Sequence, residues 1–453
     1  MATAAEPRRP EGPRRRIPGA YTLAFWRDPI RSLETLAREY GDVVHWTFGG
    51  TDAYLLKHPD HIRRVLVADH RAFMKGRALQ VTKRVLGDGL LTSEGDFHDV
   101  HRRVIQPLFH PDRIREYAGA MVAAAARARD RRRERETIDV QREMARVTLA
   151  IVGETLFSTD LEPEADEIGE ALTVSLDGLN LFMLPHTDPL ERLPLPSIRR
   201  FHAARRRLDD TIARLLDERR TSGVERADLV SVLLAAEREE GWSRAELRDE
   251  AMTILLAGHE TTASALTWTW WLLARHPEVE AKLHEELDRV LAGRLPAADD
   301  LPRLGYADMV VSESMRLFPP AWLLGRRVLV DYDLDGYGIA RGSIVILSPY
   351  VTHRDPRFYP DPLAFDPDRW TPAARRSRPR YAYFPFGGGP RVCIGEAFAR
   401  TEVILVLATL AQAWRFRPPA EYEPRLHPRV TLRPKGGMPM KLELRRARTA
   451  SRG

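Results

Sequence analysis

Cysteine is nearly absent from this sequence, and so are long hydrophobic runs. The single cysteine, Cys393, excludes an intrachain disulfide and any zinc or iron–sulfur site that needs several cysteines. The longest nearly unbroken apolar run, Val403 to Ala411, is about half as long as a membrane-spanning helix. No apolar segment follows the basic residues of the N-terminal stretch, so a secretory signal is excluded as well. We therefore expect a cytoplasmic protein without a membrane anchor.

Lysine is also scarce, with six lysines among the 70 Lys and Arg residues. The formal net charge is +6, which raises the question of nucleic-acid binding. The densest basic stretch, residues 127–136, contains Asp130, Glu134 and Glu136 among its arginines. Mixed signs at helical spacing are typical of a solvated helix face, and a docking face for an acidic partner is the alternative. The charge does not indicate a nucleic-acid binder.

The composition is that of a soluble globular chain, with 43% hydrophobic and 30% charged residues in 453. We expect a loose Pro- and Arg-rich arm at residues 1–18, a single domain over residues 19–445 and a loose tail at residues 446–453. Helical periodicity dominates, so the predicted fold is mainly α with a small β region (α+β). Helices are expected at residues 59–67, 112–133, 140–157, 197–220, 277–291 and 306–318, and strands at 43–48, 54–57, 326–330 and 343–348.

One predicted helix is much longer than the others and covers residues 244–275. Ser243 and Glu246 form a capping box at its start, and Pro277 marks its end. Its middle is apolar nearly all round, so the helix must run through the interior. Residues 258–262, Gly-His-Glu-Thr-Thr, interrupt this apolar part with polar groups. Buried polar groups need partners or a function.

Cys393 lies in an unusual loop, Phe386 to Gly395, which contains three successive glycines and a proline. Such a loop allows a large planar group to approach the backbone. The cysteine lies just before a predicted helix, whose N-terminus favours a thiolate. Arg391, two residues before it, could pair with an anionic group on the same planar molecule. The alternative is an unreactive buried cysteine beside a Gly-rich turn.

This loop resembles the heme-binding signature of the cytochrome P450 family. The resemblance extends over about residues 20–445 and implies the P450 fold, in which the long central helix lies over heme b and the cysteine loop precedes a C-terminal helix. It also implies that Cys393 is the axial thiolate ligand of the heme iron. By the same resemblance, Phe386 packs near the sulfur and Arg391 binds a heme propionate.

The polar segment of the long helix, Ala257 to Thr262, resembles the oxygen-activation motif of the same family. Gly258 weakens the helix there, and a threonine hydroxyl can compete for a backbone carbonyl. The resemblance implies that Thr261 and Glu260 deliver protons to bound oxygen. A zinc-protease HExxH motif is excluded because its fifth position is Ala263. A purely structural kink is the remaining alternative.

A Glu-x-x-Arg pair, Glu313 and Arg316, resembles another family motif, with Arg369 as the third member of a charged triad. By the resemblance, the triad is buried and holds the segment near the cysteine loop. Removing one member of a buried triad leaves an unpaired charge. The alternative is an exposed pair that contributes little to stability.

Three further residues lie at positions where the family binds the heme propionates: His98, Arg102 and Arg326. These assignments rest on the resemblance alone, because a lone histidine is more often a surface or core residue. His353, in another family-like segment, is interpreted as structural.

The resemblance implies a heme-thiolate monooxygenase that hydroxylates or epoxidises a lipophilic small molecule, such as a terpenoid, fatty acid, steroid or polyketide-like compound, with dioxygen. No flavin or dinucleotide-binding segment follows Cys393, so we expect electrons from a soluble ferredoxin and its reductase, docked by surface arginines such as Arg102 and Arg103. We expect a monomer. The alternatives are a heme-thiolate peroxygenase or isomerase, and a non-catalytic heme sensor. The expected walls of the substrate pocket are mostly apolar: residues 79–90, 179–184, 254–258, 321–324 and 436–438.

Overall fold

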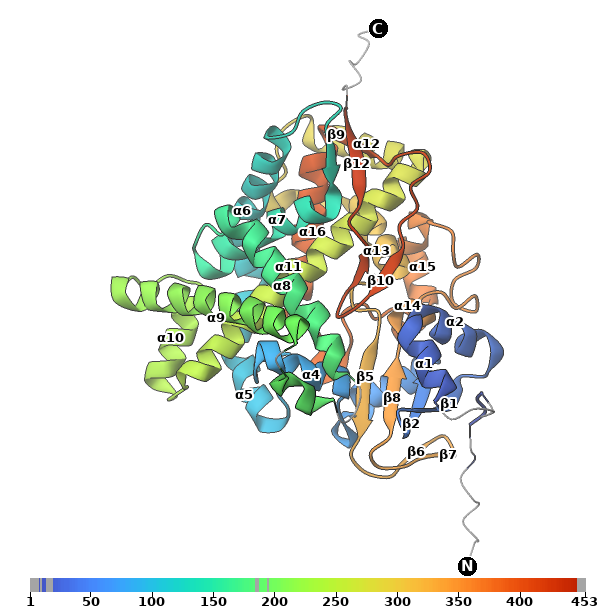
Figure 1. The fold of residues 1–453 in the computed structure, drawn as a ribbon. Helices are drawn as coiled ribbons and strands as arrows, with labels where there is room; N and C mark the ends of the chain where they lie inside the picture. Colours follow the sequence, from blue (N-terminus) through green and yellow to red (C-terminus); the bar gives the residue numbers. More distant parts are fainter. Residues whose placement is uncertain (1–7, 9, 14–18, 184–186, 194, 446–453) are drawn as a thin grey trace, which may run out of the picture.

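The computed structural model describes residues 8, 10–13, 19–183, 187–193 and 195–445. Most of the described chain is helical (Figure 1). The α-helices are α1 (Ala20–Arg27), α2 (Pro29–Glu39), α3 (Pro59–Arg63), α4 (Arg77–Leu86), α5 (Gly95–Ile105), α6 (Pro111–Asp130), α7 (Val140–Val152), α8 (Ala165–Gly178), α9 (Pro196–Ser222), α10 (Leu229–Glu239), α11 (Arg244–Arg275), α12 (Pro277–Leu291), α13 (Gly305–Leu317), α14 (Pro349–Thr352), α15 (Pro372–Ser377) and α16 (Glu396–Ala411).

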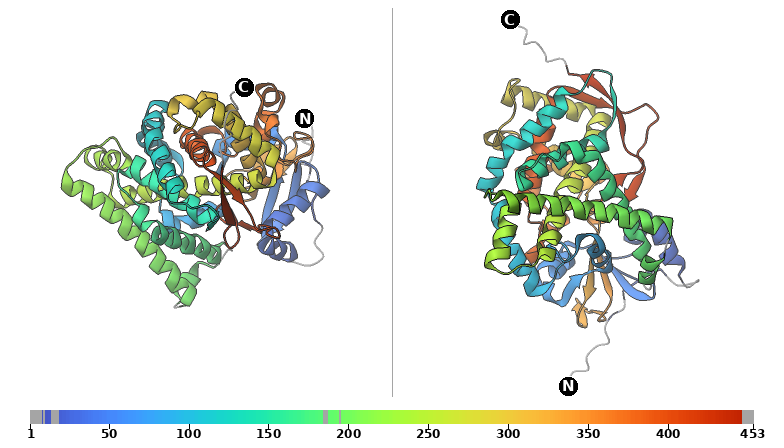
Figure 2. Two further views of the ribbon diagram at one scale, coloured as in Figure 1. Left: turned by 90° about the horizontal axis from the view of Figure 1, so that it is seen from above. Right: turned by 60° about the vertical axis from the view of Figure 1, so that its left-hand side comes forward.

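The strands are short and form small sheets beside the helical body (Figures 1 and 2). They are β1 (Val43–Phe48), β2 (Thr51–Leu56), β3 (Phe73–Lys75), β4 (Thr137–Asp139), β5 (Leu324–Val328), β6 (Tyr332–Leu334), β7 (Tyr337–Ile339), β8 (Ile344–Leu347), β9 (Trp414–Arg417), β10 (Leu426–Pro428), β11 (Leu432–Pro434) and β12 (Pro439–Leu444). The largest sheet has the order β1–β2–β8–β5–β3, in which β2 and β8 are parallel and the other pairs antiparallel. The fold is mainly α with a small β region, as predicted.

The long helix α11 has the predicted bounds. The Ser243 hydroxyl accepts the Glu246 N–H, and the Glu246 carboxylate accepts the Ser243 N–H, so both ends of the capping box are made. The helix ends at Arg275, just before Pro277. It crosses the middle of the helical body in Figure 1, and most of its residues from Leu247 to Leu273 are buried.

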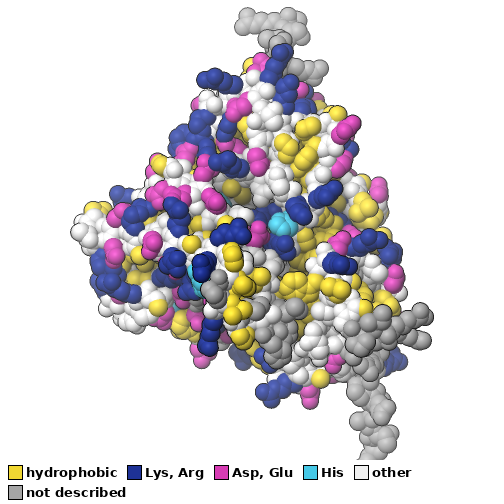
Figure 3. Space-filling view, in the orientation of Figure 1, with side chains coloured by type: hydrophobic (Ala, Val, Ile, Leu, Met, Phe, Trp, Pro, Cys, Tyr) yellow, Lys and Arg dark blue, Asp and Glu magenta, His cyan; other side chains and the backbone are white. Residues whose placement is uncertain are grey.

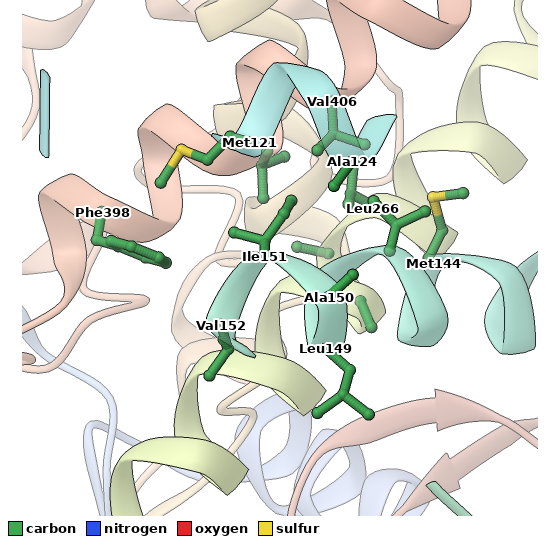
Figure 4. Packing of buried hydrophobic residues seen from close by; sticks show 14 of the residues in the cluster. Met121, Ala124, Met144, Leu149, Ala150, Ile151, Val152, Leu266, Phe398 and Val406 are labelled. Carbon is green, nitrogen blue, oxygen red and sulfur yellow. The ribbon is translucent and has the colours of Figure 1, made fainter. Parts of the chain in front are cut away.

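The main core fills the space between α6, α7, α11 and α16. Figure 4 shows side chains from these helices turned toward one another, among them Met121 of α6, Ile151 of α7, Leu266 of α11 and Val406 of α16. All four are buried. Because α16 follows the cysteine loop directly, this packing fixes the loop relative to the central helix.

Part of the expected N-terminal arm is attached to the sheet rather than loose. The backbone N–H of Arg8 donates to the carbonyl of Gly336 (2.8 Å), next to β7. The carbonyl of Glu11 accepts the N–H of His45 in β1 (2.9 Å). Backbone hydrogen bonds of this kind fix a segment that composition alone marks as mobile. Residues 1–7, 9 and 14–18, and the tail at residues 446–453, lie outside the described residues.

Candidate active site

The cysteine loop is closed by its own backbone. The N–H of Cys393 donates to the carbonyl of Phe386 (3.0 Å), and the N–H of Val392 donates to the carbonyl of Gly389 (3.0 Å). The backbone N–H of Gly395 points at the sulfur and favours the thiolate. These contacts hold the cysteine at a fixed place just before α16.

Cys393 lies at an accessible but crowded place in the loop. The side chain is exposed, yet protein surrounds it so closely that burial raises the pKa of the thiol. Gly395 and the nearby Arg102 act in the opposite direction and do not cancel the effect of burial. The helix N-terminus is expected to favour the thiolate, and the Gly395 N–H just before α16 acts in that direction.

Two of the three glycines of the loop are required by close packing within the protein. Gly387 and Gly389 have positive φ angles, 75° and 68°, which favour glycine. A Cβ on Gly389 would lie 1.9 Å from the carbonyl oxygen of Leu66, and one on Gly388 would lie 2.6 Å from the ring of Tyr381. At Gly388 and Gly389, the lack of a side chain thus allows close packing within the protein.

A buried charged cluster stands behind the loop. Arg316 and Glu313 of α13 are fully buried and joined by two hydrogen bonds of 2.8 Å. Arg369 lies 3.4 Å from Glu313, and the Trp370 indole donates to Glu313 (2.8 Å). The guanidinium of Arg316 also donates to three backbone carbonyls of the chain that leads to the loop, those of residues 353, 362 and 364. The structure thus brings the predicted triad together in a buried form.

His353 connects this cluster to the loop. Its carbonyl accepts from Arg316, and its ring Nε2 accepts the N–H of Phe384 (2.9 Å), two residues before Phe386. Burial and the neighbouring Arg316 hold the pKa of His353 well below its ordinary value, so the ring is neutral and can accept that hydrogen bond.

Cationic groups from four parts of the chain gather on one side of the loop. The antiparallel register of β3 and β5 places Lys75 directly opposite Arg326. Arg391 forms an ion pair with Glu94 and donates to the carbonyl of Ser93 (2.9 Å). His98 of α5 is buried, and its Nδ1 contacts the carbonyl of Leu90 (3.1 Å).

The pKa values of this cluster are lowered by burial first and then by neighbouring positive charge. Burial first, and then Arg391, lower the pKa of Lys75 to about 7. Burial and the same guanidinium lower the pKa of His98 to about 3, and burial lowers that of Arg326 to about 10. Glu94 is the carboxylate that acts against these shifts at Lys75 and Arg326. Like charges placed opposite each other destabilise a sheet, so the cluster is suited to bind anions.

Across from the loop, hydroxyl groups bind three successive carbonyls of α11. Thr261 donates to the carbonyl of Ala257 (2.8 Å), and Thr262 donates to that of Gly258 (2.7 Å). Thr148 of α7 donates to the carbonyl of His259 (3.0 Å). Such side-chain bonds compete with the helix ladder and bend it. A Cβ on Gly258 would lie 2.9 Å from Val152, so glycine also allows α7 to approach here.

Glu260 is buried and turned away from Thr261, toward the β10–β11 hairpin. Its Oε1 accepts the Thr431 hydroxyl (2.6 Å) and lies 3.6 Å from Nε of Arg433. Its Oε2 has no hydrogen-bond partner among the described residues. Burial raises the pKa of Glu260. Thr261 and Glu260 are adjacent, but in this structure their side chains bind different groups.

The chain was compared with known proteins. The sequence profile of the family described as Cytochrome P450 matches residues 10–440. The chain belongs to the cytochrome P450 family. Cyclooctatin synthase of Streptomyces melanosporofaciens is 42% identical over 91% of both chains, and cyclooctat-9-en-7-ol 5-monooxygenase of the same organism is 37% identical over 88% of this chain and 87% of its own. The crystal structure of the cytochrome P450DA heme domain matches with a TM-score of 0.86 at 28% identity, over 98% of this chain and 99% of that one.

This P450 is a heme-thiolate monooxygenase with heme b as its cofactor. Its own residues fit that group. Besides the exposed sulfur of Cys393, two buried polar atoms near the cationic cluster, Nε2 of His98 and Nη1 of Arg391, have no partner among the described residues. The two carboxylates of a heme would supply the partners and the negative charge that the cluster lacks.

Sequence reasoning missed two members of this cluster, Lys75 and Glu94. Lys75 carried a weak signal, because lysine is rare in this Arg-rich P450 and Lys75 precedes a glycine. Glu94 carried none beyond its place just before Gly95, where α5 begins. None of the described helices of this P450 combines the length and the apolar character that a membrane crossing requires.

Proposed function

We propose that this P450 inserts one oxygen atom of dioxygen into a lipophilic cyclic terpenoid, by hydroxylation or epoxidation. The observation that carries the proposal is an exposed cysteine on a loop that is closed by its own backbone and leads into α16, which packs against α11, where the Thr261 hydroxyl binds the Ala257 carbonyl. A bound heme supplies the oxygen chemistry, to which the thiolate contributes electron density. The remaining roles fall to side chains.

Cys393 is the proposed axial ligand, and the loop contacts described above keep it in place. We propose that His98, Arg102, Arg326 and Arg391, together with Lys75, bind the propionates. Arg102 donates to the carbonyl of Val392 (2.9 Å), next to the cysteine, and its charge favours the thiolate. Phe386 packs against the core beside the loop and limits access of water to the sulfur.

Thr261 and Glu260 are the proposed proton-delivery pair. The Thr261 hydroxyl can leave the Ala257 carbonyl and donate to a group bound beside α11, since the hydrogen bond that it gives up is a local one. Glu260 is a carboxyl whose burial raises its pKa, so it can hold a proton near neutral pH. Gly258 allows the helix to open at this point.

The substrate class rests on the relatives and on the expected pocket walls. The name of one relative describes an unsaturated cyclic alcohol, which favours a cyclic terpenoid over a fatty acid, steroid or polyketide-like compound. The expected walls are mostly apolar, which suits such a compound; residue 184 lies outside the described residues. Titration of the ferric protein with cyclic terpenoids, and with a fatty acid and a steroid for comparison, should give a spin-state change with the terpenoids alone.

Heme ligation is tested by replacing the cysteine. The reduced carbon monoxide complex of the wild type should show the red-shifted Soret band of thiolate ligation, and Cys393→Ser should lose both this band and turnover. Circular dichroism of the variant should match the wild type. A variant that keeps the red-shifted band would contradict the assignment of Cys393.

The electrons are proposed to come from a soluble ferredoxin and its reductase, in the cytoplasm, with the P450 acting as a monomer. Arg103 of α5 is exposed, in the helix that carries His98 and Arg102, and it suits an acidic partner. Arg103→Glu should lower ferredoxin-supported turnover about tenfold at low salt, and less at high salt. Substrate titration should be unchanged. Equal kinetics of wild type and variant at low salt would reject this docking face.

A further inference from the structure

The β11 strand is fixed to one face of α11. The Thr431 hydroxyl, just before β11, donates to Oε1 of Glu260 (2.6 Å). The carbonyl of Leu432 accepts from the Ser264 hydroxyl (2.6 Å) and from the Trp268 indole (2.9 Å). Residues 260, 264 and 268 lie one turn apart on the same helix face. The hairpin therefore has little freedom to move relative to Glu260.

Arg433, the next residue of β11, lies between Glu260 and the helix α8. Its Nε is 3.6 Å from Oε1 of Glu260. Its Nη2 is 3.3 Å from Oδ1 of Asp177, and its Nη1 is 3.4 Å from the Thr173 hydroxyl. The Arg433 side chain is buried, whereas Asp177 is exposed. One guanidinium is thus shared between a buried carboxyl on α11 and a surface carboxyl on α8.

The charges that act on Glu260 come from these same residues. Burial is the largest effect and raises its pKa; Arg433 and the Thr431 hydroxyl lower it, and Asp177 raises it. The buried Glu402 of α16 interacts instead with Thr262. Figure 3 shows basic side chains and a histidine gathered over the junction of α8 and the hairpin. Arg429 of the hairpin lies 3.8 Å from Asp177 and is not among the charges that act on Glu260.

We propose that Arg433 is a positioning residue that holds the Glu260 carboxyl on the hairpin side of α11, and that Asp177 of α8 weakens this hold by sharing the guanidinium. Without Asp177, the whole guanidinium would be available to Glu260. The carboxyl would then be held as a charged partner of Arg433 and not as a proton donor. Asp177, on the helix that leads into an expected wall of the substrate pocket, therefore controls whether Glu260 is ready to give a proton. The proposal rests on the proposed function for the role of Glu260 in proton delivery.

The test measures the titration of Glu260 in the resting ferric protein, so it needs neither substrate nor turnover. Infrared difference spectra over a pH series identify the protonated Glu260 carboxyl as the band that is absent in Glu260→Gln. Arg433→Gln should raise its pKa by about 1 or more, since an opposite charge at this distance lowers a carboxyl pKa by roughly one to three. Thr431→Val should raise it by less. Asp177→Asn should lower it, because a negative charge and a competitor for Arg433 are removed.

Arg429→Gln is the matched control. It removes an equal charge from the same hairpin, next to the same aspartate, without a contact to Glu260, so the Glu260 pKa should stay within about 0.3 of the wild type. If Arg433→Gln does not fold, Arg433→Lys, which keeps the charge, replaces it. The Glu260 pKa should then rise by less than about 0.5. An unchanged titration in both Arg433→Gln and Thr431→Val, an equal shift in Arg429→Gln, or an unchanged titration in Asp177→Asn would overturn the proposal.

A kinetic measurement separates this proposal from the proposed function. With the terpenoid that gives a spin-state change, Asp177→Asn should release several-fold more peroxide per oxygen consumed, while its substrate affinity stays unchanged. If no terpenoid is turned over, the proposed function fails and the infrared result still decides the role of Arg433. If turnover occurs and Asp177→Asn forms as much product per oxygen consumed as the wild type, the role proposed for Asp177 of α8 is contradicted.

Discussion

The Arg316 side of the site and the α11 side treat buried charge in opposite ways. All five donors of the Arg316 guanidinium are used, and Glu313 is bound by Arg316, Trp370 and the N–H of Asp366. On α11, by contrast, one oxygen of Glu260 and both ring nitrogens of His259 have no partner among the described residues. A satisfied network fixes a geometry, whereas a polar group that lacks a partner is free to bind water or to move a proton. The network of Arg316 and Glu313 is thus built for rigidity, and the α11 side is built for chemistry.

The largest effect should be a loss of stability on disrupting the Arg316 network, in which every donor has a partner. Arg316→Met leaves the buried Glu313 with only the more distant Arg369 as a cationic partner, and it leaves three backbone carbonyls without their donor, which should cost about 3–5 kcal/mol of unfolding free energy. Urea unfolding of the heme-loaded protein measures it. Arg369→Met, at the longer contact, should cost clearly less. Equal losses for the two variants would show that the two arginines do not differ as described.

A smaller effect, on catalysis rather than on stability, should follow from changing the polar residues of α11. Thr261→Ala should lower product formed per oxygen consumed by about a hundredfold, with peroxide released instead, since the proton donor is lost. Its unfolding free energy should change by less than about 1 kcal/mol. Thr262→Ala, which removes the matching bond to Gly258, is the control and should stay coupled. A peroxygenase, an isomerase or a heme sensor would behave like the wild type in Thr261→Ala.

The smallest effect should be the pH response of His259. Burial lowers its pKa from 6.5 to about 4, so between these values the unfolded chain binds the proton and the folded protein does not. Stability from this group is therefore present above pH 6.5 and lost as the pH falls toward 4. His259→Leu should remove about 2 kcal/mol of the loss between pH 6.5 and 5, and change stability at pH 7.5 by less than about 1 kcal/mol. Urea midpoints at the three pH values test this. An identical pH slope in the variant would contradict it.

The sequence predicted those elements whose ends carry local signals. The bounds of α11 followed from its capping box and its proline, and α12 from its N-terminal proline and amphipathic pattern. The strand β2 begins at Thr51, earlier than expected, because Gly49 and Gly50 turn the chain and pair Thr51 with Phe48. The pattern missed α8, whose helix depends on packing against α9.

The site was predictable where residues lie close in the chain. Motifs found Cys393, Thr261 and Glu313. The register that places Lys75 opposite Arg326 joins segments about 250 residues apart in the numbering, and no local pattern carries that information. The direction of the Glu260 carboxyl was equally hidden, because Thr431 and Arg433 reach it from the other end of the chain.

The close approach of Gly389 to Leu66 has a consequence for the inheritance of this enzyme. Any side chain at position 389 would push the loop away from the neighbouring π-helical turn at Arg64–Ala68 and carry the sulfur with it. A single change there could abolish cofactor retention while every ligating residue survives intact. Descendants of such a gene would still carry the iron-binding cysteine, yet yield a colourless protein.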